Sequence, residues 1–255
     1  MILKTNIKTA IKEKFLNALF ISRVVLCLLG NFVLAFGVAM AVKADLGITP
    51  VNSIAFVLSK VFYLDHGLMT GVIYASYVLI QLALLRREFR INNLLQAGAA
   101  IIFGWFVFLC NHILAFPTPE LYPIRLLFLL AGIGIIGLGI MLYLRADFIP
   151  QPAEGLILAI QKKTGWKLHN IKVAFDSSVV VIAAIISFIT IKKIVGIREG
   201  TLISMIGIGK CLGFFTKYLG GKIDALFRLS KKSDSWPITP IPCTPTESHE
   251  PESSP

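Results

Sequence analysis

Residues 30–50 read GNFVLAFGVAMAVKADLGITP, and residues 132–152 read GIGIIGLGIMLYLRADFIPQP. Each stretch is a glycine-rich apolar run that ends in a basic residue, followed by Ala-Asp and then by a proline that opens a short amphipathic stretch. Six positions share one register, 102 residues apart: Gly30 with Gly132, Gly37 with Gly139, Lys43 with Arg145, Ala44 with Ala146, Asp45 with Asp147, and Pro50 with Pro152. Unrelated stretches rarely agree this far, so the sequence predicts an internal duplication.

The composition is that of an integral membrane protein. Hydrophobic residues make up 56% of the chain and charged residues only 15%, and the mean hydropathy is +0.77. These values lie outside the range of soluble globular domains. The net charge of +11 comes from basic residues at the ends of apolar runs, as in cytoplasmic loops, so the expected partner is the lipid bilayer and not a nucleic acid. The four cysteines show no disulfide or zinc spacing, and no metal or cofactor is expected.

Six apolar runs are long enough to cross a bilayer core of about 30 Å at about 1.5 Å per residue. They cover residues 24–42, 68–85, 94–114, 126–144, 173–191 and 201–219. Two shorter runs, 51–62 and 153–163, follow prolines and are too short to cross. The predicted fold is therefore an all-α membrane protein with six transmembrane helices and two short half-helices.

The basic residues decide how the two copies are oriented. Three crossings per copy start the second copy on the opposite side of the membrane, which makes the repeat inverted. With the N-terminus inside, the basic cluster at residues 86–90 is inside and the loop 116–120 is outside, as the positive-inside rule requires. Four crossings per copy would place residues 86–90 outside. We therefore expect both termini to be cytoplasmic in a plasma (inner) membrane, with Lys192, Lys193 and Arg198 as exceptions on the outer side.

Four segments follow from this pattern. Residues 1–20 form a basic cytoplasmic tail along the bilayer surface, residues 21–115 the first membrane repeat and residues 121–219 the second. Residues 220–255 are basic and then rich in proline and serine, which predicts a disordered cytoplasmic tail.

The stretch Lys43-Ala44-Asp45-Leu46-Gly47, the proline after it, Gly200-Thr201 at the start of the last span, and the duplicated layout resemble the YitT/YczE-like family of bacterial multi-pass integral membrane proteins. The resemblance covers residues 25–219. The second copy departs from it, because it reads Phe148-Ile149 where the family pattern has Leu-Gly. That family has no settled biochemical activity, so the resemblance implies a membrane protein of undetermined role, with transport among the candidates.

The charges of the repeated turns are the first candidates for a substrate or ion site. They are Lys43, Asp45, Arg145 and Asp147. Transporters present such sites beside broken helices, whose ends carry dipoles and unpaired backbone groups. The alternative is that these residues are interfacial anchors, or a structural turn duplicated with its gene segment. The turns themselves are predicted at Gly47, Pro50 and Pro152.

Asp176 and Lys210 interrupt otherwise apolar spans, where a charge costs at least about 2.5 kcal/mol. We interpret them as an ion relay or a gate, and we expect them to pair because their spans are consecutive. Asp176 lies near the start of its span, so reaching the headgroups is the alternative for that residue. Four weaker signals are interpreted as helix-end or packing residues: Asn31, His112, Glu154 and His169.

No catalytic motif is present, and the sequence does not predict an enzyme. The favoured function is a secondary transporter or channel for an unidentified small solute or ion. The alternative is a non-transporting membrane scaffold or assembly factor. A transporter requires a water-accessible cavity lined by the charged repeat residues, whereas a scaffold would hold them in salt bridges or at the interface. The sequence leaves open whether the protein forms a homo-oligomer.

Overall fold

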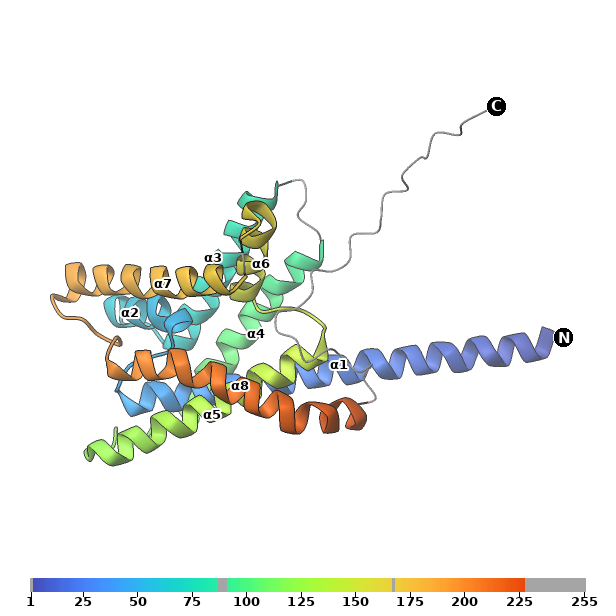
Figure 1. The fold of residues 1–255 in the computed structure, drawn as a ribbon, viewed down its shortest axis with the longest axis horizontal. Coiled ribbons are helices and arrows are strands. Elements are labelled where there is room, and N and C mark those ends of the chain that lie inside the picture. The colour runs from blue at the N-terminus through green and yellow to red at the C-terminus, as the bar shows by residue number, and fades with distance from the viewer. Residues whose placement is uncertain (1, 87–90, 167, 228–255) are drawn as a thin grey trace, which may run out of the picture.

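The computed structural model describes the backbone of residues 2–86, 91–166 and 168–227, and the side chains of residues 20–86, 94–166 and 170–227. All regular structure in this part of the chain is helical (Figure 1). The elements are α1 (Ile2–Ala44), η1 (Pro50–Asn52), α2 (Ser53–Phe62), α3 (His66–Leu85), α4 (Ile91–Ile113), α5 (Tyr122–Ala146), α6 (Pro152–Thr164), α7 (Leu168–Ile191) and α8 (Glu199–Leu226).

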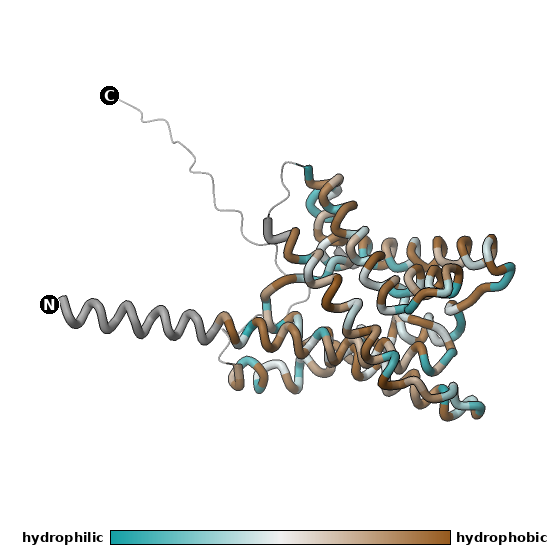
Figure 2. Tube along the Cα trace, turned by 180° about the vertical axis from the view of Figure 1, so that it is seen from behind, coloured by the Kyte–Doolittle hydropathy of each residue, from teal (hydrophilic) through white to brown (hydrophobic). Residues whose placement is uncertain are grey.

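Six of these helices are long and apolar enough to cross a membrane, which confirms the six predicted spans. The spans are Phe20–Ala44, His66–Leu85, Leu94–Ile113, Tyr122–Ala146, Asn170–Ile191 and Glu199–Leu226. Figure 2 shows hydrophobic residues along the long helices, and many of the large ones are exposed on the surface of the bundle. An apolar surface of this extent is what a lipid-facing bundle presents.

The remaining helices, α2 with 10 residues and α6 with 13, are the two short helices that the sequence predicts. Two boundaries differ from the prediction. The helix α1 begins at Ile2, because no glycine or proline interrupts the chain before Gly30, so the predicted N-terminal tail continues the first span. The helix α8 extends to Leu226, and the predicted C-terminal tail from residue 228 onward lies outside the described residues.

The repeated Ala-Asp marks the place where a long helix ends. Asp45 follows α1 with a φ of 50°, and Asp147 follows α5 with a φ of 48°. Aspartate tolerates this left-handed conformation better than most residues, so it can end a helix without a glycine. Pro50 and Pro152 then start η1 and α6, where the fixed φ of proline suits the first helical position.

The most extensive helix–helix contact among the described residues is that between α1 and α5, and it is made through the glycines of the repeated pattern. A Cβ atom on Gly30 would lie 3.0 Å from the carbonyl oxygen of Gly139, and one on Gly37 would lie 2.9 Å from that of Gly132. The earlier glycine of α1, Gly30, therefore meets the later glycine of α5, Gly139. This order of contacts shows that the two helices cross antiparallel. Their backbones touch because no side chains separate them.

The two short helices pack against long helices that lie far away in the sequence. The helix α2 packs on α7 as well as on α3, and α6 packs on α3 as well as on α7. The helix α8 packs on α5, and α4 packs on α1 and α3. The consecutive spans α7 and α8 therefore have different main neighbours, contrary to the expectation that they lie side by side.

Candidate functional site

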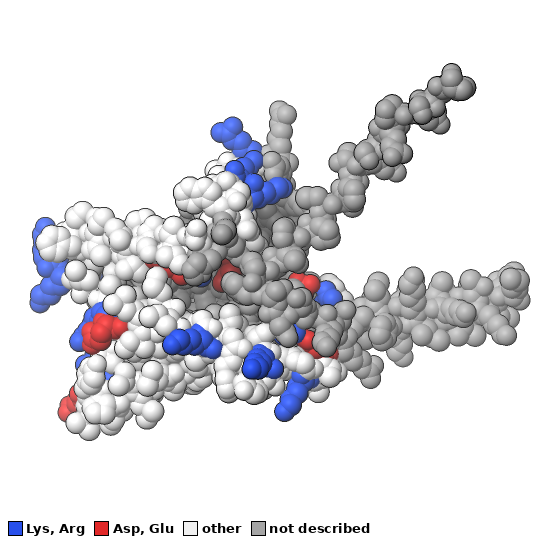
Figure 3. All heavy atoms as spheres, in the orientation of Figure 1, with Lys and Arg blue, Asp and Glu red and all other residues white. Residues whose placement is uncertain are grey.

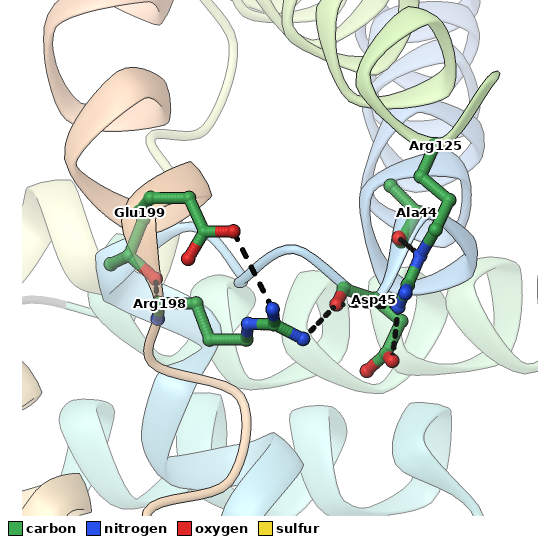
Figure 4. A network of polar contacts seen from close by, with 6 residues as sticks. Ala44, Asp45, Arg125, Arg198 and Glu199 are labelled. Atoms are coloured by element: carbon green, nitrogen blue, oxygen red, sulfur yellow. Dashed lines mark hydrogen bonds and ion pairs between the residues drawn. The ribbon is translucent and has the colours of Figure 1, made fainter. Parts of the chain in front are cut away.

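The first charged turn is fastened by two arginines from other helices (Figure 4). Arg125 at the start of α5 pairs with the carboxylate of Asp45, and its Nε donates a 2.9 Å hydrogen bond to the carbonyl oxygen of Ala44. Arg198 donates from Nη1 to the carbonyl oxygen of Asp45 at 3.1 Å. These contacts join α1, α5 and α8 at one end of the bundle, and they occupy the helix-end carbonyls that the turn leaves free.

The motifs that carry the family resemblance meet at the same end. The backbone nitrogen of Gly200 donates to the carbonyl oxygen of Leu46 at 2.8 Å. Gly47 has a φ of 123°, and a Cβ atom on it would lie 2.6 Å from the hydroxyl of Thr201. Leu46-Gly47 and Gly200-Thr201 therefore form one contact between the first turn and the start of α8, in which glycine is needed on both sides for the close approach.

The second charged turn is fastened by a buried ion pair. Arg145 donates from Nη1 to Oδ2 of Asp224 at 2.6 Å, and the two side chains are 7% and 8% exposed. Gly220 makes room for the guanidinium group, because a Cβ atom there would lie 2.4 Å from Nη2 of Arg145. Asp224 is near the end of α8, so this pair joins α5 to α8 at the opposite end of the bundle from Asp45.

Of the six charged residues singled out in the sequence, only Asp176 lies in the interior of the bundle away from the two turns. Lys43 lies with its ammonium group 4.9 Å from the ring centre of Phe116, and Lys210 is exposed on α8. The partner of Asp176 is Lys172, one turn earlier on the same helix, at 3.0 Å. The predicted pairing of Asp176 with Lys210 is therefore wrong, because α7 and α8 pack on different neighbours.

A set of buried and partly buried polar side chains surrounds the start of α6, and we call it the α6 polar cluster. Its members come from α1, η1, α3, α4, α5, α6 and α7 and the loop before α6. They are Asn31, Asn52, Tyr74, Tyr77, Gln81, Gln96, Tyr143, Gln151, Glu154, Lys172 and Asp176. Figure 3 shows a few acidic atoms between the α7 and α8 layers, whereas most Lys and Arg atoms stand at the helix ends and over α8.

Side chains of two long helices fix the start of α6. Gln151, which precedes the helix, donates from Nε2 to Oδ1 of Asn31 at 2.6 Å. Gln81 donates from Nε2 to the carbonyl oxygen of Pro152 at 3.0 Å. Both bonds are buried, so α1 and α3 hold the first turn of the short helix in one position.

Four polar atoms of the cluster are buried and make no hydrogen bond of ordinary geometry among the described residues, although the phenol of Tyr143 and the carboxyl group of Glu154 lie within hydrogen-bonding reach of each other. They are Oη of Tyr77, Oε1 of Gln96, Oη of Tyr143 and Oε2 of Glu154. The side chains of Tyr77, Gln96 and Tyr143 belong to residues that are only 5%, 4% and 2% exposed. Each buried polar atom left unpaired costs about 1–3 kcal/mol, and such groups in a native structure mark strain or function.

Glu154 is the electrostatic centre of the cluster. Burial raises the pKa of its carboxyl group, and the charge of Asp176 raises it further, whereas Lys172 acts in the opposite direction. The hydroxyl of Tyr143 lies beside the carboxyl group, and Tyr74 lies within range of the charges of both carboxylates. Two acidic groups and one ammonium group thus share a site, in which the side chain of Asp176 is 11% exposed and that of Lys172 is 32% exposed.

Aromatic rings line the cluster on the side of α3. The ring of Tyr74 stacks on that of Phe103 with 5.2 Å between ring centres. The ring of Tyr77 meets Phe175 edge to face at 5.6 Å. The hydroxyl of Tyr74 donates to Oδ1 of Asn52 at 3.2 Å, which brings the first turn of the other short helix into the same cluster.

The sequence interpretation missed most of this site because it weighed charges in long spans. Tyr77, Gln96 and Tyr143 are neutral, and Glu154 was interpreted as a helix-end residue. One signal could have found part of the cluster. The register of 102 residues continues past the turns and relates Asn52 to Glu154, Thr70 to Lys172, and Tyr74 to Asp176. When the two stretches are aligned with an offset of 102 residues, polar residues near the two short helices and in the spans after them therefore fall at the same positions.

The described residues contain no group of three or more metal-ligating side chains that could hold a metal ion. Six apolar spans around a buried polar cluster define a multi-pass membrane protein. The chain belongs to the family of unknown function DUF6198, which matches residues 21–217.

The chain is also similar to the uncharacterized membrane protein YczE of Bacillus subtilis strain 168, with 28% identity over 144 residues. The aligned part covers 56% of this chain and 65% of the relative, so it takes in slightly less than two thirds of that protein. No solved structure matches the chain. These findings confirm the YczE-like resemblance inferred from the sequence.

Proposed function

We propose that the protein is a secondary transporter or channel that moves a small solute or ion by way of the α6 polar cluster. The observation that carries this proposal is the set of unpartnered buried atoms around Glu154, among spans whose outer surfaces are apolar. An ionisable group at membrane depth is costly and is by default associated with a pathway or relay. The cluster keeps free hydrogen-bonding capacity on both neutral and charged side chains.

The architecture that we propose for this transporter is the inverted repeat. Gly30 meets Gly139 and Gly37 meets Gly132, a reciprocal pattern that a pseudo-two-fold axis between α1 and α5 would produce. The same axis would exchange the contact of α2 with α7 and that of α6 with α3. In transporters of this kind, binding sites lie where the repeats meet and where short helices begin.

The proposed orientation keeps both termini cytoplasmic in the plasma (inner) membrane, with the repeats at residues 21–115 and 121–219. The two ion-paired turns support it. The Asp45–Arg125 contact would lie on the outer side with Arg198, and the Arg145–Asp224 pair on the inner side. Each turn thus joins helix ends that six crossings place on one side of the membrane.

A non-transporting scaffold or assembly factor is the second candidate, and one observation favours it. Asp45 and Arg145 are engaged in ion pairs, as a scaffold would require of the charged repeat residues. We propose no enzymatic activity and no bound cofactor.

Flux through proteoliposomes separates the two candidates. The full chain is reconstituted, ion and solute gradients are imposed, and currents and solute uptake are recorded. We expect movement by the wild type that Glu154→Gln abolishes. The matched control is Glu199→Gln, which makes the same chemical change at a partly exposed side chain of α8. A wild type that moves nothing under any gradient, or an equal loss in both variants, would favour the scaffold.

A further inference from the structure

The unmet hydrogen-bonding capacity of the α6 polar cluster is largely of one kind. The carboxylate oxygen of Glu154 and the amide oxygen of Gln96 can only accept hydrogen bonds. The phenol oxygens of Tyr77 and Tyr143 can accept as well as donate. A ligand with N–H donors would find acceptors in all four groups, whereas an anion would find a free donor only in the phenol of Tyr77, because the phenol of Tyr143 lies within hydrogen-bonding reach of Glu154.

The charge of the cluster points in the same direction. The ammonium group of Lys172 is held by the carboxylate of Asp176 at 3.0 Å, and the two charges offset each other. The carboxylate of Glu154 then supplies the remaining charge, and among the described residues the cation that acts on it is the same Lys172. A site with one excess negative charge is suited to a monovalent cation.

The surroundings also suit a small cation. Aromatic rings attract cations, and Tyr74 lies within range of the charges of both carboxylates, whereas Tyr77 lies within range of that of Asp176. The amide of Gln96 lies against the backbone of Gly155, the residue after Glu154, because a Cβ atom on Gly155 would lie 2.4 Å from Oε1 of Gln96. A ligand of a few heavy atoms fits this description better than an extended chain.

We propose that the α6 polar cluster binds a small monovalent cation that carries N–H donors, either ammonium or a small protonated amine. Glu154 is its counter-charge, and Tyr77, Gln96 and Tyr143 accept its hydrogen bonds. The inference rests on the proposed transport function, since it names the solute class of that same site.

Binding to the full chain in detergent is measured without transport, as the shift of the thermal unfolding transition with added salt. Ammonium and methylammonium chloride are compared with tetramethylammonium and potassium chloride at equal ionic strength. Tetramethylammonium has the same charge but no N–H donor. We expect saturable stabilisation by ammonium and methylammonium alone.

Two variants test the assigned groups. Glu154→Gln removes a charge-assisted hydrogen bond and should weaken ammonium binding about 10- to 100-fold, whereas Tyr143→Phe removes a neutral one and should weaken it about 2- to 10-fold. Glu199→Gln should bind as the wild type does. If Glu154→Gln fails to fold, Tyr143→Phe and the pH dependence of the wild type decide.

The pH dependence has a defined direction. Protonation of Glu154 removes the counter-charge, so ammonium binding should fall as the buffer is made acidic. The other titratable groups that face this carboxyl are Lys172 and Asp176 from α7, Tyr143 from α5 and Tyr74 from α3. Acid protonates only Asp176 among these, which frees Lys172 and weakens cation binding further.

The outcomes separate the two proposals. Equal stabilisation by tetramethylammonium or potassium, or binding of an anion instead, would overturn the cation assignment. Movement of an uncharged or anionic solute in proteoliposomes without ammonium binding would overturn it too, and would leave the transport function standing. Ammonium binding that depends on Glu154, with no flux of any solute, would support the site and overturn transport.

Discussion

Removing one partner of the buried Arg145–Asp224 pair should destabilise the protein strongly. The change Asp224→Asn leaves the guanidinium group in a site where the two side chains are only 7% and 8% exposed. Little water is present to screen the charge that loses this partner, and the loss for breaking such a buried pair is about 3–5 kcal/mol. An equivalent change at the other end, Asp45→Asn, affects a carboxylate that is 62% exposed and should cost about 0–1 kcal/mol.

The assay is unfolding of the purified protein in mixed micelles by added SDS, followed by tryptophan fluorescence. A loss of about 3–5 kcal/mol lowers the folded-to-unfolded ratio by roughly two to three and a half powers of ten. The double change Arg145→Met with Asp224→Leu should recover most of this loss, because apolar side chains of similar size replace a buried ion pair at little net cost. If the stability of Asp224→Asn stays within about 1 kcal/mol of that of the wild type, the Arg145–Asp224 pair does not act as a buried ion pair that stabilises the contact of α5 with α8.

Three further outcomes are expected. Glu154→Gln should be more stable than the wild type in neutral buffer and equal to it in acid, because a carboxyl whose pKa is raised by folding loses stability as the pH rises through its folded pKa; thermal unfolding of both proteins across that range checks this, and a constant difference would contradict it. Gly139→Ala should destabilise by about 1–3 kcal/mol, because its Cβ atom would lie 2.5 Å from the backbone nitrogen of Leu34. Gly134→Ala, with nothing within 4 Å, should instead gain about 0.5–1 kcal/mol from helix propensity. Similar shifts for both variants in SDS unfolding would argue against the packing. Cysteines at Glu120 and Lys222 should react with an impermeant maleimide from opposite sides of the membrane, and labelling from the same side would remove the six-span topology.

The sequence was sufficient for the spans because hydrophobicity over about twenty residues is a strong and local signal. Asp-containing helix ends and the prolines after them also act through the local backbone, and α1 and α5 end directly before Asp45 and Asp147. Asp45 and Asp147 have nearly the same φ, so an aspartate at both positions has a conformational reason apart from any ligand. A substrate-facing role for the turn residues remains a prediction.

The polar cluster could not be assembled from the sequence in the same way. Its members are single polar residues spread over six helices and two short connecting segments, and most are neutral, so none stands out in a hydropathy profile. Their meeting depends on α6 packing against α3 and on α2 packing against α7, which are contacts between halves of the chain. The pairing of Asp176 with Lys210 failed for the same reason, because adjacency along the chain was assumed to mean adjacency in space.

The glycine contact between α1 and α5 has a consequence for biosynthesis. The first helix has its closest partner about a hundred residues later in the chain, so α1 enters the bilayer before the surface that fits Gly30 and Gly37 exists. During that interval lipid must cover its glycine face, and only the arrival of Gly132 and Gly139 allows the backbones to close. In the same way, α2 cannot make its contact with α7, nor α3 its contact with α6, until those later helices have been synthesised. The first half of this chain is inserted early but acquires its native neighbours late, and a ribosome stalled before α5 would hold a set of helices in the membrane without the contacts that define the fold.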